Sequence, residues 1–87
     1  MLKELIGQQV IVDLGSTFVC LGTLLRCDEQ FLELADADLH DIRDTPTNRE
    51  NYVAAARASG IIPNRSKVLL VRGEVIAVSR LPDAIRC

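Results

Sequence analysis

The chain has few aromatic residues and no tryptophan. Of its 87 residues, two are phenylalanine and one is tyrosine, so aromatic side chains make up 3% of the sequence. Proteins that hold single-stranded nucleic acid on rows of stacked aromatics need more of them, and this class of binder is disfavoured. The net charge is also small. Twelve acidic and ten basic residues leave a charge of −2, so any contact with a phosphate backbone must come from a local basic patch.

Long apolar segments are missing too. No run approaches the ~18 residues of a membrane-spanning helix, and the N-terminal Met-Leu-Lys-Glu-Leu-Ile lacks the apolar core of a signal peptide. The three cysteines, Cys20, Cys27 and Cys87, form no C-x-x-C pair, which is typical of small apolar residues in a reducing compartment. We therefore expect a cytoplasmic protein with no membrane partner. The length predicts one domain, residues 1–87.

The sequence shows no constellation of catalytic residues or metal ligands. Its one histidine, His40, lies in an acidic stretch, Asp36 to Asp44, that lacks the clustered ligands or the glycine of a calcium-binding loop. The first half of this stretch is predicted to extend the preceding strand and the rest to be a loop. A solvated segment is favoured over a metal site there, because charge runs usually form solvated faces. The cysteines and the remaining carboxylates are scattered along the sequence, so no nucleophile is paired with a general base. We expect neither an enzyme nor a bound metal or cofactor.

Apolar residues recur at the two-residue spacing of β-strands in five short segments. The predicted strands cover residues 8–14, 17–27, 31–35, 68–71 and 75–78. Gly22, in the middle of the second strand, predicts the sharp bend that a small curved sheet or barrel requires. Gly73, between the last two strands, predicts a tight turn with a positive φ, and this turn places Arg72 at an exposed corner.

Two helices are predicted. Apolar residues at helical spacing, stopped by a glycine, indicate a short helix within residues 2–6. The clearest helix is 47–59, because it is rich in alanine, ends before a glycine and begins with Thr47 and Glu50 at the spacing of a capping box. Three residues form its narrow apolar stripe: Tyr52, Val53 and Ala56. Such a stripe predicts packing on a small surface or across a neighbour.

Two short motifs stand on either side of the longer helix. The first, Gly-Thr-Leu-Leu-Arg-Cys-Asp-Glu-Gln-Phe-Leu, runs from Gly22 to Leu32, and the second, Val-Arg-Gly-Glu-Val-Ile, runs from Val71 to Ile76. In this order and spacing they resemble the two motifs of the Sm-like (LSm) protein family. The chain resembles a divergent bacterial or phage-type member with an enlarged loop between strands three and four.

The resemblance covers residues 1–35 and 67–81. It implies a mainly β, Sm-like fold, in which a short N-terminal helix precedes a strongly bent, five-stranded antiparallel open barrel. The segment between the two matched parts, about residues 36–66, then forms an inserted loop with an extra helix between strands three and four.

The resemblance also implies a candidate RNA-binding site. Its residues are Asp28, Gln30, Leu32, Arg72 and Gly73. In RNA-binding members of the family, a uracil stacks between the arginine of the second motif and a side chain of the first, while an asparagine of the first motif bonds the base edge. Here Leu32 takes the asparagine position and Gln30 the stacking position, so the uridine-type site is altered. Gln30 could still bond a base, and Arg72 could still stack.

A structural role for the same residues stays open. Asp28 and Arg72 could pair with each other to brace adjacent loops, as ion pairs in turns often do. Candidates for a basic patch are Arg65, Lys67 and Arg72, together with Arg26. If they cluster, they would offer the local positive charge that RNA binding needs.

Finally, the resemblance implies assembly. Family members pair the fourth strand of one subunit with the fifth strand of the next, and here residues 68–71 and 75–78 are apolar, with no proline or lysine to block pairing. We expect a homo-oligomeric ring of about five to seven subunits. Two functions stay open: an RNA-binding or RNA-associated ring scaffold, and a protein-interaction ring that binds no RNA. In either, helix 47–59 could dock a neighbour or a partner protein.

Overall fold

The structure, a computed structural model, describes residues 1–44 and 47–85. Thr45, Pro46, Arg86 and Cys87 lie outside the described residues. Near the end of the described part lies a short 3-10 helix, η4, at Leu81–Asp83.

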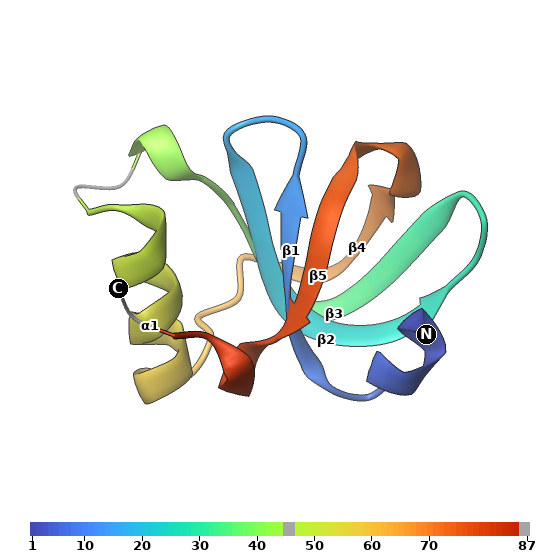
Figure 1. The fold of residues 1–87 in the computed structure, drawn as a ribbon, viewed down its shortest axis with the longest axis horizontal. Helices are drawn as coiled ribbons and strands as arrows, with labels where there is room; N and C mark the ends of the chain where they lie inside the picture. The colour runs from blue at the N-terminus through green and yellow to red at the C-terminus, as the bar shows by residue number, and fades with distance from the viewer. Residues whose placement is uncertain (45–46, 86–87) are drawn as a thin grey trace.

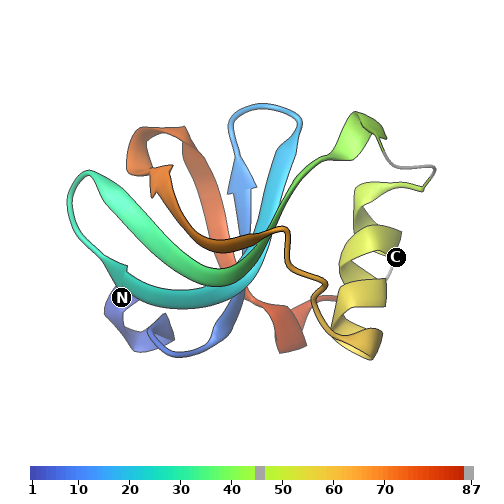
Figure 2. The same ribbon diagram turned by 180° about the vertical axis from the view of Figure 1, so that it is seen from behind.

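Five antiparallel strands form one sheet, with the order β4-β3-β2-β1-β5 (Figure 1). Along the chain the described elements are η1 (Leu2–Leu5), β1 (Gln9–Leu14), β2 (Phe18–Cys27), β3 (Phe31–Asp41), η2 (Ile42–Asp44), α1 (Arg49–Ser59), β4 (Arg65–Val71), η3 (Arg72–Glu74), β5 (Val75–Arg80) and η4. Although only η3 separates β4 from β5, these two strands occupy opposite edges of the sheet. The sheet therefore curls until its edges approach each other, and it forms the predicted open barrel. Figure 2 shows β4 from behind, with the chain leading into it from α1.

The bend of the sheet lies where Gly22 of β2 crosses β3. Leu21 pairs with Asp38 but Thr23 pairs with Ala35, so β3 carries one extra residue, a β-bulge, at this point. Asp36 within the bulge has a φ of +49°. A Cβ atom at Gly22 would lie 3.1 Å from the carbonyl oxygen of Ala35, which is closer than side chains normally approach backbone. The close approach of the two strands thus favours a glycine at this position, which lies at the bend that the sequence predicted.

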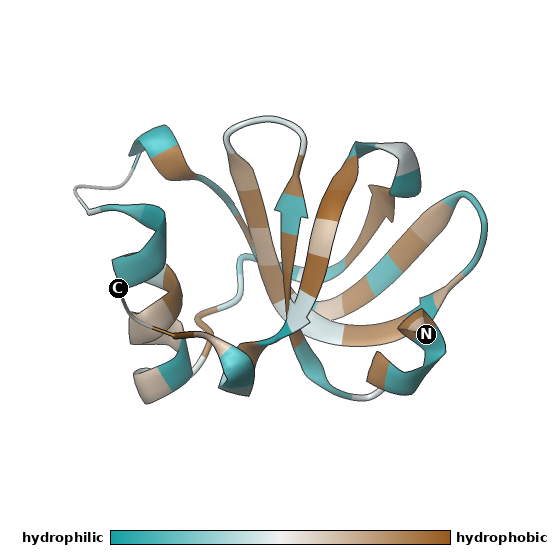
Figure 3. Ribbon diagram, in the orientation of Figure 1, coloured by the Kyte–Doolittle hydropathy of each residue, from teal (hydrophilic) through white to brown (hydrophobic). Residues whose placement is uncertain are grey.

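Both faces of the sheet are partly buried, which gives the protein two apolar cores. The first fills the inside of the barrel, and its buried members are Val10, Val12, Cys20, Leu24, Leu32, Leu34, Ala37 and Leu70. The second lies on the outer face under α1, and its buried members are Ile11, Val19, Leu21, Val53 and Leu81. Figure 3 shows apolar positions along the strands and on the sheet-facing side of α1. Burial raises the pKa of the Cys20 thiol to about 12, so this cysteine is an inert core residue.

The inserted helix α1 packs on the chain's own sheet. Its apolar stripe enters the second core, and polar contacts hold it at each turn. Arg49 Nε donates to Asp13 Oδ1 at 2.7 Å, the Tyr52 hydroxyl donates to the Asp38 carboxylate, and Arg57 donates to the carbonyl of Ala84. A partner protein would therefore meet the outer face of the helix and not its apolar stripe. No helix within residues 1–44 and 47–85 is long and apolar enough to cross a membrane.

Several local details differ from the sequence expectations. The N-cap of α1 is Asn48, whose side chain accepts from Asn51 N, and not Thr47, because the helix begins one residue later. Strands β3 and β4 extend beyond the predicted limits, to Asp41 and from Arg65, so the insert is shorter than predicted. The N-terminal helix is a single 3-10 turn, η1.

The predicted positive φ at Gly73 is wrong. The described residues with a positive φ are Gly7, Gly60 and Asp36. Gly73 lies instead inside η3, a 3-10 turn built from ordinary negative φ angles. The Arg-Gly-Glu tripeptide was expected to form a tight hairpin turn. It links two strands that do not pair with each other, so that turn geometry is not required.

The close approach at Gly22 makes a stability prediction. Gly22→Ala places a methyl group against the Ala35 carbonyl and against Ala37, both backbone-anchored, and we expect it to lower the free energy of unfolding by about 1–3 kcal/mol. The matched control is Gly73→Ala, because a Cβ there would meet no atom within 4 Å. Urea denaturation of both variants checks this, and equal stabilities would contradict the role given to Gly22.

Candidate nucleic-acid interface

Four of the five predicted site residues meet at one corner of the molecule. The β3–β4 ladder ends with the pair Phe31 and Val71, so the residue after Val71 lies beside the turn before Phe31. There the backbone N–H of Arg72 donates to the Gln30 carbonyl at 2.8 Å, and its Nη1 donates to the Asp28 carbonyl at 2.5 Å. The side chains of Gln30 and Arg72 are both exposed. The corner therefore presents an exposed guanidinium group, and both the backbone and the side chain of Arg72 are hydrogen-bonded to main-chain carbonyls of the turn.

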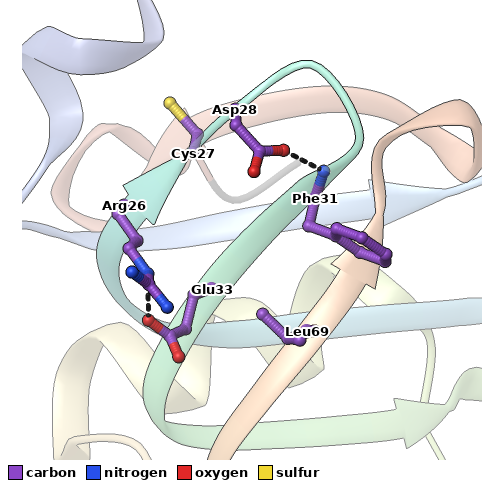
Figure 4. A pocket seen from close by; sticks show the side chains of 6 residues that line it. All are labelled: Arg26, Cys27, Asp28, Phe31, Glu33 and Leu69. Atoms are coloured by element: carbon purple, nitrogen blue, oxygen red, sulfur yellow. Dashed lines mark hydrogen bonds and ion pairs between the residues drawn. The ribbon is translucent and has the colours of Figure 1, made fainter.

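Asp28 organises the turn between β2 and β3. Its Oδ1 accepts from the backbone N–H groups of Gln30 at 2.8 Å and Phe31 at 2.7 Å, and the second bond is visible in Figure 4. These two bonds, with smaller contributions from Arg26 and Arg72, lower the pKa of Asp28. The alternative role, in which Asp28 and Arg72 brace adjacent loops, is thus observed in a modified form. Arg72 ties the turn to η3 through the main-chain carbonyl of Asp28 and not through its carboxylate.

Leu32, the fifth predicted residue, does not reach the corner. It is 0% exposed and belongs to the inner core, where it pairs across the ladder with Leu70. Alternation along β3 explains this placement, because Phe31 and Glu33 point to the outer face and Leu32 points inward. The position expected to read a base edge is therefore closed to a ligand in this protein.

A hollow of about 570 Å³ lies on the Arg72 side of the corner. It is lined by residues 1–3, residues 27–29 and Arg72. The N-terminal segment is held there because Gly7 N donates to the Leu24 carbonyl at 2.7 Å. Lys3 thereby adds a second cation to the hollow. The sequence analysis missed Lys3 because nothing in its local pattern indicates which turn η1 lies against.

A second hollow, of about 360 Å³, lies on the other side of the same turn (Figure 4). It is lined by Arg26, Cys27, Asp28, Phe31, Glu33 and Leu69. Arg26 Nε donates to Glu33 Oε1 at 2.8 Å across the β2–β3 pair. The sequence analysis did not single out Phe31, Glu33 or Leu69. The alternation of β3 and β4 contained a signal, because it places all three on the outer face.

The predicted basic patch is divided in the structure. Arg65 and Lys67 pair with Ala37 and Ala35, toward the end of β4 that is far from Arg72. They do not join Arg72 at the corner. Arg26 lies closer to it, in the second hollow.

The acidic stretch from Asp36 to Asp44 is strand as far as Asp41, beyond the strand extension predicted for its first half, and the 3-10 helix η2 follows where a loop was predicted. Its carboxylates have local partners. Asp38 accepts from Asn64 Nδ2 at 3.1 Å, and burial raises its pKa. Asp41 accepts from Arg43 Nη2 at 2.8 Å, and the hydrogen bonds from Arg43 hold its pKa well below the usual range. In the described ranges, no three His, Cys, Asp or Glu side chains are grouped so that they could hold a metal ion.

The comparisons with known proteins support the fold. No protein-family model matches the chain, and a search of curated proteins finds no match. Among solved structures, the chain is similar to a Pyrococcus abyssii Sm protein determined in complex with a uridine heptamer, with a TM-score of 0.62 and 20% sequence identity. The alignment covers 90% of this chain and 89% of that chain. The chain therefore has the Sm fold, and the mainly β, Sm-like architecture predicted from the two motifs is confirmed.

The role of the Asp28 carboxylate can be tested by pH titration. Its contribution to the turn should be complete above the ordinary aspartate pKa of 3.8 and should be lost as the pH falls through the lower folded value. In NMR spectra the amide signals of Gln30 and Phe31 should then titrate with the Asp28 carboxyl signal. Asp28→Asn keeps an acceptor oxygen and should preserve both amide bonds without titrating, whereas Asp28→Ala should lose them. Equal amide protection in the two variants would contradict this role.

Proposed function

We propose that this protein is a ring-forming, RNA-associated scaffold that contacts a nucleotide at the corner formed by Arg72 and Gln30. The observation that carries the proposal is the exposed Arg72 guanidinium, whose main chain and side chain are both tied to the neighbouring turn. A cation held in this way loses little freedom on binding, and its planar face can stack on a base. Lys3, in the adjoining hollow, supplies a contact for phosphate.

The proposed site has little power to select uridine. With Leu32 buried, the side chain beside Arg72 that offers hydrogen bonds to a base is Gln30. No hydrogen bond within the described residues occupies its carboxamide, which presents one acceptor and two donors. A flexible amide on an exposed turn can meet several base edges, so we expect a weak base preference. The Sm protein in complex with a uridine heptamer supports RNA as the ligand class, while the altered side chains support a different selectivity.

Assembly into a ring is part of the proposal. β4 and β5 are the free edges of the sheet, and each has unpaired backbone groups that another subunit can satisfy. The edge strands also expose large apolar side chains, Leu69 and Val71 on β4 and Ile76 on β5. Pairing β4 of one subunit with β5 of the next would cover part of this surface and would continue head to tail until a ring of about five to seven subunits closes.

A ring that serves as a protein scaffold without RNA is the second candidate. The observation that favours it is the burial of Leu32, because the position expected to read a base then has an apolar side chain that a ligand cannot reach. The charge of −2 per chain points the same way, because it repeats with every subunit. The two candidates predict the same ring and differ in whether oligonucleotides bind.

RNA binding should depend on Arg72. We expect Arg72→Ala to weaken the affinity for a single-stranded oligonucleotide about 10-fold or more, because it removes both a charge and a stacking surface. Arg43→Ala is the matched control, since Arg43 is an exposed arginine that pairs with Asp41 away from the corner. Fluorescence anisotropy at two salt concentrations measures both variants. Unchanged affinity in Arg72→Ala would refute the proposed site, and no binding by the wild type would favour the protein scaffold.

Ring closure should depend on the exposed edge of β5. Ile76 is 72% exposed, and Ile76→Lys places a charge where the neighbouring subunit would pack, so we expect smaller assemblies or monomers. Ile62→Lys is the control, because Ile62 is 84% exposed in the segment before β4 and lies outside both edge strands. Native mass spectrometry gives the subunit count of each variant. A wild-type monomer would contradict the proposed assembly, and an intact Ile76→Lys ring would contradict pairing through this part of β5.

A further inference from the structure

One margin of the second core is polar, and it lies where the insert meets β3. Asp38 pairs with Leu21 and His40 pairs with Val19, and both partners are buried members of that core. Because the side chains of directly paired residues lie on the same face of a sheet, Asp38 and His40 point to the outer face. β3 therefore places a carboxylate and an imidazole beside the surface that α1 covers.

Two parts of the insert are attached to these side chains. In α1, the Tyr52 ring stacks on the His40 ring, with 4.9 Å between the ring centroids, and the Tyr52 hydroxyl donates to Asp38 Oδ2. In the segment that leads into β4, Asn64 Nδ2 donates to Asp38 Oδ1 at 3.1 Å and to the Leu39 carbonyl at 2.9 Å. We call Asp38, His40, Tyr52 and Asn64 the polar cluster.

The position of His40 suits a neutral imidazole. Its Nε2 is buried and has no hydrogen-bond partner within the described residues, while its Nδ1 lies 3.8 Å from Asp38 Oδ1. A neutral ring with its proton on Nδ1 directs that N–H toward the carboxylate and leaves no N–H on the buried side. An imidazolium has an N–H on both nitrogens. The one on Nε2 would carry part of a positive charge in a buried place without an acceptor, which is unfavourable.

The elements around His40 present few charges to it. Its charged partner among the described residues is Asp38, on the same strand. The groups that face it or flank the cluster from other elements are Val19 on β2, Tyr52 on α1 and Asn64 before β4, together with Arg65 of β4, which donates to the Asn64 carbonyl at 3.1 Å. The Cys20 thiol of β2 belongs to the inner core, and its raised pKa keeps it uncharged.

Asp38 cannot offset the cost of an imidazolium without disturbing the insert. A carboxylate attracts a protonated imidazole. At 3.8 Å, however, one of the two side chains must move before a hydrogen bond forms. Asp38 already accepts from Tyr52 and Asn64, so this movement strains the bonds that attach the insert to β3.

We propose that His40 makes the attachment of the insert sensitive to acid. The neutral imidazole keeps α1 and Asn64 on the sheet, and protonation of His40 weakens this attachment. Histidine is the side chain that normally changes charge between about pH 5 and pH 8. When α1 loosens, the apolar surface formed by Ile11, Val19 and Leu21 becomes accessible. This inference does not depend on RNA binding.

The Asp38 carboxylate acts in the opposite direction. Burial raises its pKa, so its charge is unfavourable in the folded protein, and its protonation at lower pH favours the folded state. The contribution of neutral His40 is complete at higher pH and is lost as the pH falls through its titration. Replacing one residue at a time separates the two effects.

Hydrogen exchange measured by NMR on the whole chain tests the proposal. Protection factors, corrected for the pH dependence of intrinsic exchange, compare the amides of α1 with those of inner-core residues such as Leu24 and Leu34. Between about pH 8 and pH 5, we expect the protection of α1 to fall about 5- to 30-fold relative to the inner core. The chain has one histidine and one tyrosine, so the ring signals of His40 and Tyr52 are unambiguous and should change with one midpoint.

Two variants identify the titrating group. His40→Phe keeps an aromatic ring for Tyr52 to stack on but cannot be protonated, and we expect the protection of α1 to become independent of pH in this range. Asp38→Asn keeps an acceptor oxygen for Tyr52 but does not titrate, and we expect the response to acid to persist. Circular dichroism confirms that each variant is folded. If either variant does not fold, the shared midpoint of His40 and Tyr52 in the wild type still tests the proposal.

Loss of α1 protection in acid that requires His40 and persists in Asp38→Asn supports the inference. An equal loss in the wild type and in His40→Phe assigns the response to another group and overturns it, as does a loss that disappears in Asp38→Asn alone. Protection of α1 that rises in acid means that the attraction of Asp38 for the imidazolium prevails, and this also overturns the inference. So do separate midpoints for the His40 and Tyr52 signals in the wild type.

Discussion

The close contact between β2 and β3 at Gly22 is the constraint on which the rest of the structure depends. A residue without a Cβ lets the Ala35 carbonyl approach without crowding, and the extra residue in β3, Asp36, adds local twist at the same place. Together they turn a flat antiparallel pair into a bent one. Once β2 and β3 bend, the sheet curls around the inner core, and β4 and β5 become free edges that approach each other.

The same curvature assembles the candidate site. Arg72 belongs to a segment more than forty residues away from Asp28 in sequence, and the two meet because β4 pairs with β3 up to the Phe31–Val71 pair. The turn is already ordered by the Asp28 carboxylate, so Arg72 meets a rigid partner. The fold and the site are therefore linked through one short ladder. A change that shifts the β3–β4 register by one residue would separate the guanidinium from the turn and would expose Leu32.

The overall fold could be predicted from the sequence because alternation, glycine position and the two motifs all pointed to the same strands. The prediction was less complete for features that depend on contacts between residues far apart in the sequence. The residues around Val53 do not indicate that it packs on the outer face of β1 and β2. Lys3 lies at the site because Gly7, which follows η1, donates a hydrogen bond to Leu24 of β2. The positive φ at Gly73 was wrong because the local Arg-Gly-Glu pattern does not reveal that its flanking strands lie at opposite edges. Asp28, Gln30 and Arg72 could be proposed as site residues from the sequence because they belong to the two motifs, whereas the position of Phe31 and Leu69 beside them depends on the register of β3 and β4.

The packing of α1 on the sheet has a consequence for the solubility of this chain. The helix and the strands beneath it supply opposite halves of one core, and its contacts with Asp13, Asp38 and Ala84 fix it to three separate parts of the fold. Removing the insert would take Val53 away from Ile11, Val19 and Leu21 and would leave Leu81 to cover them, so part of this apolar surface would face water. A shortened chain would then be more prone to aggregation even with its barrel intact. The insert is thus a structural part of the fold, because it covers one half of a core.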